Sequence, residues 1–288
     1  EFMKRILFAM LGIAALSGHG ALAQSSVDTL ARIKQAKAIN VAYSPDSLPF
    51  SMSEANGDPA GYTIDLCKRA IAQIGRTVGE GNLKVNWIPG SVSERLQMIA
   101  AGRADLECAN TTPTQSRLAT VDFSNLVFVD SGGLLVKAGA PINATSDLSG
   151  KRVAVLKGTT TETRLNEMLR RRLINASVVT TANAVEGITM LESGSVDAYA
   201  GDKIKLVGLM ATTKDPRLFA LLAEDLSFEP YALALPRGDS KLRLEVNKAL
   251  TQIYTSPDIE AIFTQWMGRI GRPSPMLAAM YLLNSIPE

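Results

Sequence analysis

Short apolar runs alternate with amphipathic segments along most of the chain. Between residues 62 and 74, apolar side chains return at Ile64, Cys67, Ile71 and Ile74, which is the spacing of one face of a helix. This spacing predicts a helix that turns Cys67 toward a core. Around it, the pattern predicts helices over residues 27–37 and 93–100 and strands over residues 39–42, 83–88 and 105–108. Such alternation indicates right-handed βαβ units and a largely parallel sheet.

The same alternation starts again at residue 151. Here the pattern predicts strands over residues 151–156, 177–180 and 196–200, and helices over residues 158–172, 184–193 and 203–210. Two extended runs, at residues 126–136 and 231–235, flank this block, and we interpret them as hinge strands. The sequence therefore predicts an α/β fold of two mixed-sheet lobes joined by two hinge strands. Residues 24–128 and 232–288, with helices after residue 240, form lobe 1, and residues 129–231 form lobe 2.

The first residues have the pattern of an export signal. Met3 is followed by Lys4 and Arg5, an apolar run over residues 6–16 and the sequence ALA at residues 21–23, the small-residue pattern that signal peptidase recognises. The apolar run is too short for a membrane-spanning helix. We therefore expect residues 1–23 to be a two-residue cloning remnant plus a signal peptide, cleaved after Ala23, and the mature chain to start at Gln24 and to be exported.

Charge and composition exclude several classes of function. The chain has 30 basic and 28 acidic residues, and without residues 1–23 it has 28 and 27, so no charge excess favours nucleic acid. The one histidine, His19, lies in the predicted signal peptide, so the mature chain can build neither a Ser-His-Asp triad nor an imidazole zinc site. We expect no metal, no cofactor and no catalytic residue. Cys67 and Cys108 can pair in an oxidising compartment, but the sequence leaves open whether they do.

A polar turn follows the strand predicted over residues 105–108. Asn110, Thr111 and Thr112 offer backbone N–H groups and polar side chains, and Arg117 follows five residues after Thr112. Such donors on one side of an anion, with a planar guanidinium on the other, can hold a carboxylate. An arginine in a polar loop is also a common solvated surface charge, so this turn alone does not decide the function.

Lobe 2 offers two further candidates. Gly158, Thr159 and Thr160 lie where a strand turns into a helix, and the free N–H groups of a first helical turn favour an anion. The same residues also make a good helix cap. Asp202 follows a later strand, and open α/β sheets bind ligands at such strand ends. Its carboxylate can take an ammonium group or cap the next helix.

These elements, in this order, resemble the ligand-binding residues of periplasmic amino-acid-binding proteins, the solute-binding subunits of ABC importers. The likeness covers essentially the whole mature chain and includes the motifs LPF at 48–50, GYTID at 61–65, VDFS at 121–124 and LESG at 191–194. It implies the periplasmic-binding-protein fold and a monomer that closes around a free amino acid and presents it to a membrane permease. It also implies that Arg117, Thr112 and Thr160, with Thr159 beside it, hold the α-carboxylate, and that Asp202 and Asn110 hold the α-ammonium.

The motif LECANTT at residues 106–112 is most similar to the glutamate/aspartate-binding branch of that family. Arg95 matches one arginine that this branch uses for the side-chain carboxylate of the ligand. Ser44 stands where the branch usually has another arginine, Ala184 where it has a histidine and Val92 where it has a serine. The resemblance therefore implies glutamate or aspartate, with another polar or neutral amino acid or a carboxylate relative as alternatives. Arg95 is either a ligand contact or a solvated helix charge.

A periplasmic enzyme on the same scaffold, similar to the cyclohexadienyl dehydratases, is the alternative from another class. The missing histidine argues against acid–base catalysis, although a glutamate or lysine can also transfer protons. We expect a binding protein that makes and breaks no bond.

Overall fold

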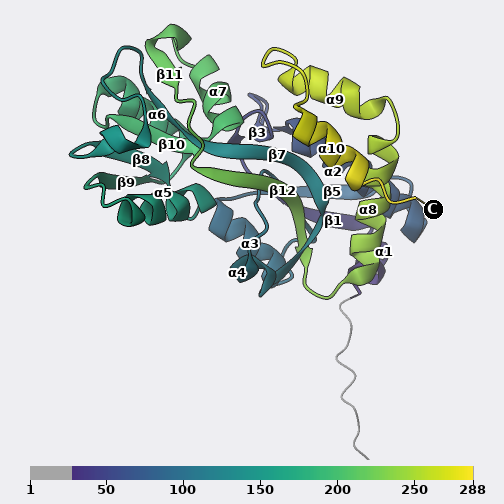
Figure 1. Ribbon diagram of the computed structural model, residues 1–288. Helices are drawn as coiled ribbons and strands as arrows, with labels where there is room; N and C mark the ends of the chain where they lie inside the picture. The colour runs from purple at the N-terminus through teal and green to yellow at the C-terminus, as the bar shows by residue number, and fades with distance from the viewer. Residues whose placement is uncertain (1–27, 288) are drawn as a thin grey trace, which may run out of the picture.

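The computed structural model describes residues 28–287, so the predicted signal peptide and its cleavage site lie outside the described residues. Within this range the chain forms two α/β lobes connected by two long strands (Figure 1). The predicted fold class is therefore confirmed. None of the helices in residues 28–287 combines the length and the apolarity that are needed to cross a bilayer.

Lobe 1 is built around α2 (Tyr62–Val78), whose apolar face packs on a parallel sheet. Ile64, Cys67 and Ile74 on this face are fully buried, so the helical spacing predicted the core correctly. In the sheet, β1 (Ala38–Tyr43) lies between β5 (Lys84–Pro89) and β6 (Leu106–Cys108). The remaining helices of the lobe are α1 (Thr29–Ala36), α3 (Val92–Ala100), the short α4 (Gln115–Leu118) and the C-terminal α8 (Ser240–Tyr254), α9 (Asp258–Met267) and α10 (Pro275–Leu283). After β1, the chain forms a small sheet of β2 (Asp46–Ser47), β3 (Ser51–Ser53) and β4 (Pro59–Ala60).

Lobe 2 repeats the alternation of strands and helices. Its strands are β8 (Arg152–Leu156), β9 (Ser177–Thr181), β10 (Ala198–Asp202) and the short β11 (Phe219–Leu221). Its α-helices are α5 (Thr160–Arg171), α6 (Ala184–Ser193) and α7 (Lys203–Ala211). β8 pairs in parallel with both β9 and β10, and apolar side chains pack on both faces of this sheet. The predicted elements of this lobe are all present; the helix predicted over residues 184–193 has the predicted ends, and the other ends differ by at most two residues.

The two hinge strands are longer than predicted. β7 (Val121–Lys137) and β12 (Ser227–Pro236) pair antiparallel along most of their length and continue the sheets of both lobes, in the order β5-β1-β6-β12-β7-β10-β8-β9 (Figure 1). β7 begins at Val121, five residues before the predicted start at residue 126. Val121 and Phe123 are buried and alternate with more exposed neighbours, which is the pattern of a strand with one buried face. The pairing register shifts at Tyr231/Ala232 and Ala232/Ala234. The exact lobe boundaries at 128/129 and 231/232 stay predictions.

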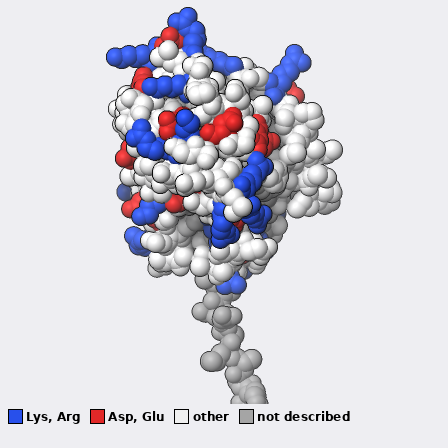
Figure 2. Space-filling model, turned by 60° about the vertical axis from the view of Figure 1, so that its left-hand side comes forward, with Lys and Arg blue, Asp and Glu red and all other residues white. Residues whose placement is uncertain are grey.

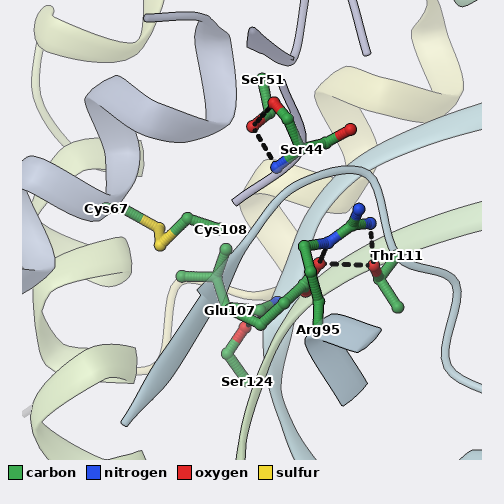
Figure 3. The surroundings of a disulfide bond; sticks show 9 residues. Ser44, Ser51, Cys67, Arg95, Glu107, Cys108, Thr111 and Ser124 are labelled. Carbon is green, nitrogen blue, oxygen red and sulfur yellow. Dashed lines mark hydrogen bonds and ion pairs between the residues drawn. A yellow bond between two sulfur atoms is a disulfide. The ribbon is translucent and has the colours of Figure 1, made fainter. Parts of the chain in front are cut away.

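Cys67 and Cys108 form a disulfide (Figure 3). Cys67 lies on the buried face of α2 and Cys108 at the end of β6, and both side chains are fully buried. The bond therefore fastens the core helix of lobe 1 to the strand that leads into the polar turn at Asn110. The sequence could not decide the pairing because it depends on how α2 packs on β6.

Charged side chains of both signs are interspersed on the side of the molecule that carries lobe 2 (Figure 2). Other charged side chains are buried, and most of these lie near the junction of the lobes. The buried ones include Arg95, Asp105, Glu107, Asp130, Lys205 and Glu229. Because burial strengthens electrostatic interactions, those of these residues that lie in the cleft matter most for the site.

Candidate functional site

Three hydrogen bonds that join the two lobes lie along one cleft. Asn110 Nδ2 donates to Asp202 Oδ2 at 3.1 Å, and Arg117 Nη2 donates to the Gly158 carbonyl at 3.2 Å. The backbone N–H of Ala184 donates to the carboxylate of Asp46 at 2.8 Å. The polar turn of lobe 1 and the strand ends of lobe 2, which the sequence pointed to separately, therefore meet in space.

Asp202 ends β10 and directs its carboxylate into this cleft. It accepts hydrogen bonds from Thr161 Oγ1 at 2.9 Å and from the Tyr231 hydroxyl at 2.7 Å, besides that from Asn110. Asp202 also precedes α7, but its side chain makes no capping hydrogen bond there. The alternative interpretation as a helix cap is therefore wrong.

Arg117 lies on α4, and in the described part of the chain its guanidinium donates only to carbonyl oxygens. Nη1 donates to the Thr112 carbonyl at 2.7 Å, and Nη2 donates to Gly158. Burial lowers the pKa of Arg117, while the carboxylates of Glu107, Glu229 and Asp202 oppose this effect. A guanidinium remains charged at neutral pH, so Arg117 supplies a cation that no salt bridge neutralises within residues 28–287.

Thr112 and Thr160 come from different lobes but share one acceptor. Each hydroxyl donates to Glu229 Oε2 at 2.6 Å, and Ser227 Oγ donates to Glu229 Oε1 at 2.6 Å. Glu229 lies on β12 and is 1% exposed, and burial raises its pKa, with a further contribution from Asp202. The sequence analysis missed Glu229, because a glutamate between Phe228 and Pro230 in an extended run carries no local sign of burial.

Thr159 faces its own helix more than the cleft. Its side chain accepts the Glu162 N–H as the N-cap of α5 and donates to the Leu156 carbonyl at 2.7 Å. The Gly158 N–H is occupied by the Glu162 carboxylate at 2.6 Å. The cap interpretation of this turn therefore holds for Thr159, and Thr160 is the residue whose hydroxyl reaches Glu229 on β12.

A second carboxylate shares Tyr231 with Asp202. The Tyr231 hydroxyl lies 2.7 Å from Asp202 Oδ2 and 3.3 Å from Asp130 Oδ2. Burial, followed by the nearby charge of Asp202, raises the pKa of Asp130 to about 7. One hydroxyl proton can serve only one carboxylate at a time, so a protonated Asp130 that donates to the Tyr231 oxygen satisfies both contacts. No group of three or more His, Cys, Asp or Glu side chains in residues 28–287 is arranged to hold a metal ion.

Arg95 is 2% exposed and forms a buried ion pair, so the alternative of a solvated helix charge is wrong. Its Nε donates to Glu107 Oε1 at 2.7 Å (Figure 3), and Nη1 donates to the Gly90 carbonyl at 2.8 Å. Nη2 lies 3.4 Å from the hydroxyl of Thr111. Glu107 has no exposed side-chain surface, and the sequence analysis did not identify it as the partner of Arg95.

Ser44 is also buried, and its hydroxyl contacts the side-chain oxygen atoms of Asp46 and Ser47. Its hydroxyl donates to Asp46 Oδ1 at 3.1 Å and lies 2.8 Å from the hydroxyl of Ser47. Asp46 in turn accepts the Ala184 N–H at the start of α6. Ser44 and Ala184, which stand where the glutamate/aspartate branch has an arginine and a histidine, therefore both donate a hydrogen bond to the carboxylate of Asp46. The sequence analysis did not consider Asp46.

The cleft is tightly closed. A cavity of about 30 Å³ remains beside Ser44, Asp46 and Arg95, whereas pockets for small-molecule ligands have volumes of roughly 300–1,000 Å³. A larger, mainly apolar hollow of about 840 Å³ lies next to α9 and α10, but Arg117, Asp202 and the threonines do not line it. The opposite charges of Arg117 and Asp202 therefore lie in the cleft and not in this hollow. Because so little space remains in the cleft, it must open before a ligand can enter.

The sequence of residues 39–269 matches the bacterial extracellular solute-binding proteins, family 3. The chain belongs to this family. It is 31% identical over 255 residues to an L-glutamate/L-aspartate-binding protein of Pseudomonas aeruginosa, covering 88% of this chain and 84% of the relative. It is 30% identical over 267 residues to an ABC transporter glutamine-binding protein of Bacillus subtilis, covering 91% and 94%.

Solved structures agree with this assignment. An ancestral amino acid-binding protein, a precursor of cyclohexadienyl dehydratase, superimposes with a TM-score of 0.71 at 26% identity. The match covers 83% of this chain and 99% of that one. These similar proteins are named as binding proteins.

Proposed function

We propose that the protein captures a free α-amino acid between its lobes and delivers it to the permease of an ABC importer. The observation that carries this proposal is the presence of opposite charges in one cleft, the guanidinium of Arg117 and the carboxylate of Asp202. A zwitterion removed from water needs a partner for each of its charges, because a buried charge without a partner costs several kcal/mol. The relatives named for glutamate, aspartate and glutamine share the α-amino and α-carboxyl groups as the common part of their ligands.

Arg117 and the hydroxyls of Thr112 and Thr160 take the α-carboxylate in this proposal. Both hydroxyls already donate to one carboxylate oxygen, that of Glu229, so their geometry suits such a group. An incoming α-carboxylate takes over these donors, and Glu229 keeps its hydrogen bond from Ser227. The raised pKa of Glu229 favours its neutral form next to a second carboxylate.

Asp202 and Asn110 take the α-ammonium. Asp202 is held in place by Thr161 and Tyr231, so its orientation does not depend on the ligand. The side-chain oxygen of Asn110 can accept a further N–H while its Nδ2 donates to Asp202.

Opening and closing occur about β7 and β12. The pairing register between β12 and β7 shifts at Tyr231/Ala232, which is the lobe boundary predicted at 231/232. A ligand that contacts both lobes favours the closed form, because its contacts are complete only there.

We also propose the compartment in which the protein acts and that it leaves its ligand chemically unchanged. The protein acts as a monomer in the periplasm after loss of residues 1–23, and it binds its ligand without chemical change. Asp130 and Glu229 have raised pKa values, which are also common in general acids, so turnover needs a direct test. NMR after prolonged incubation should recover the bound compound unchanged.

A thermal-shift screen of the standard amino acids tests the proposal. A specific ligand at a thousandfold excess over its Kd stabilises the folded protein by roughly 4 kcal/mol, whereas a compound that does not bind shifts nothing. A screen in which no amino acid raises the melting temperature would refute the proposal.

A further inference from the structure

The cavity beside the anchors decides which side chain the ligand can carry. It is lined by Ser44, Asp46 and Arg95 from lobe 1 and by Leu156 and Lys157 from lobe 2, among others. Arg95 contacts Thr111, which lies between the anchor residues Asn110 and Thr112, and Lys157 directly precedes the Gly158 turn. The cavity therefore adjoins the proposed anchors on both lobes and lies where a ligand side chain must pass or end.

The charge of Arg95 is already neutralised. Glu107 lies 2.7 Å from Arg95 Nε, and the two side chains are 2% and 0% exposed, so water screens this pair little. Figure 3 shows Arg95, Glu107 and Thr111 hydrogen-bonded to one another. A guanidinium has five N–H groups, and three of them are used here, which leaves one on each terminal nitrogen. Arg95 can therefore donate to a ligand oxygen without supplying a net positive charge.

Asp46 adds a negative charge to the same cavity. Each of its carboxylate oxygens accepts one hydrogen bond, from Ser44 Oγ and from the Ala184 N–H, and each can accept another. Lys157 at the rim is exposed and carries the opposite charge. The charges of Asp46, Lys157 and the Arg95–Glu107 pair add up to zero. Lys205, which is buried on α7, lines the neighbouring small hollow beside Asp202; burial lowers its pKa, and the carboxylates of Asp46 and Asp202 oppose this effect.

We propose that this cavity selects a primary carboxamide, so that the ligand is glutamine or asparagine rather than glutamate or aspartate. The carboxamide oxygen accepts from a free N–H of Arg95, and its NH₂ group donates to Asp46. A carboxylate in the same position can accept from Arg95, but it offers Asp46 no proton and adds a second negative charge to a cavity whose lining carries no net positive charge once Arg95 is paired with Glu107. This specificity rests on the proposed function, because the anchors place the side chain at the cavity.

Calorimetric titration of the full chain with glutamine, asparagine, glutamate, aspartate, serine and alanine tests this proposal. The better carboxamide should bind at least tenfold more tightly than its acid counterpart, a difference of about 1.4 kcal/mol. Asp46→Asn keeps the shape of the side chain but removes its charge, so it should reduce the amide-to-acid ratio at least fivefold. Asp58→Asn, an exposed change in the nearby loop between β3 and β4, should leave the ratio unchanged.

Two results would overturn the carboxamide assignment while leaving the proposed function intact. One is an acid, or serine or alanine, that binds the wild type more tightly than both amides. The other is an amide-to-acid ratio that stays the same in Asp46→Asn. If that variant does not fold, Glu107→Gln frees the charge of Arg95 and should shift the ratio in the same direction. Failure of every amino acid to bind would instead refute the proposed function itself.

Discussion

Removal of Arg95 should destabilise the protein strongly, even though no ligand is present. In Arg95→Ala, Glu107 keeps only the hydrogen bond from Thr111, and its other oxygen already has no partner in the described structure. Breaking a buried ion pair by removing one partner costs about 3–5 kcal/mol, because the remaining charge is uncompensated. This value needs no large reduction for solvent screening, since the side chains of Arg95 and Glu107 are 2% and 0% exposed.

Urea unfolding followed by circular dichroism measures this cost. The midpoint should fall while the dependence of the unfolding free energy on urea stays the same. Arg164→Ala serves as the control, because Arg164 is 57% exposed and pairs with Glu167 at 2.9 Å on the surface of α5. Its loss should cost less than about 1 kcal/mol.

A double variant separates charge from packing. In Arg95→Met/Glu107→Leu both charges disappear, so the unfolding free energy should lie closer to that of the wild type than in Arg95→Met or Glu107→Leu alone. The reasoning fails if Arg95→Ala costs no more than Arg164→Ala, or if the double variant loses the sum of the two single losses.

Three further predictions concern the anchors, the hinge and the disulfide. Arg117→Ala and Asp202→Ala should each weaken amino-acid binding by about 2–5 kcal/mol in calorimetry, because each leaves a ligand charge without its partner, and a loss below threefold would show that the site is misplaced. The folded state holds the Asp130 proton up to about pH 7, so this group's stabilising contribution is complete at low pH and is lost as the pH rises from about 4 to 7. Asp130→Asn should remove this part of the pH dependence of urea unfolding, and an unchanged profile would contradict the assignment. Reduction of the Cys67–Cys108 bond should lower the unfolding free energy by about 2–4 kcal/mol, whereas the Cys67→Ser/Cys108→Ser variant should not respond to reductant.

The sequence predicted those features that depend on neighbouring residues or on the order of motifs. The spacing of Ile64, Cys67, Ile71 and Ile74 defined α2 because a helix with one buried face repeats every three to four residues. The strand ends at Asn110 and Asp202 could be identified because parallel strands bring such ends to one edge of a sheet. The disulfide could not be predicted, because it depends on the distance between α2 and β6.

The carboxylates of the cleft were missed for a similar reason. Glu229 contacts Thr112 and Thr160, which lie 117 and 69 residues away in sequence. Asp46 contacts Ala184 across 138 residues. Nothing in the residues around Glu229 or Asp46 indicates these partners, since the contacts join segments that are far apart in the sequence. Arg95 and Glu107 are closer in sequence, but their pairing depends on how α3 packs on β6.

A crystal structure of the protein with the amino acid that stabilises it most tests the central claim directly. The account predicts the α-carboxylate about 3 Å from the Arg117 guanidinium and from the hydroxyls of Thr112 and Thr160, with the α-ammonium on Asp202. Glu229 should then have given up both threonine hydroxyls. A ligand found in the hollow beside α9 and α10, or in the cleft with Glu229 still bound to Thr112 and Thr160, would contradict the account.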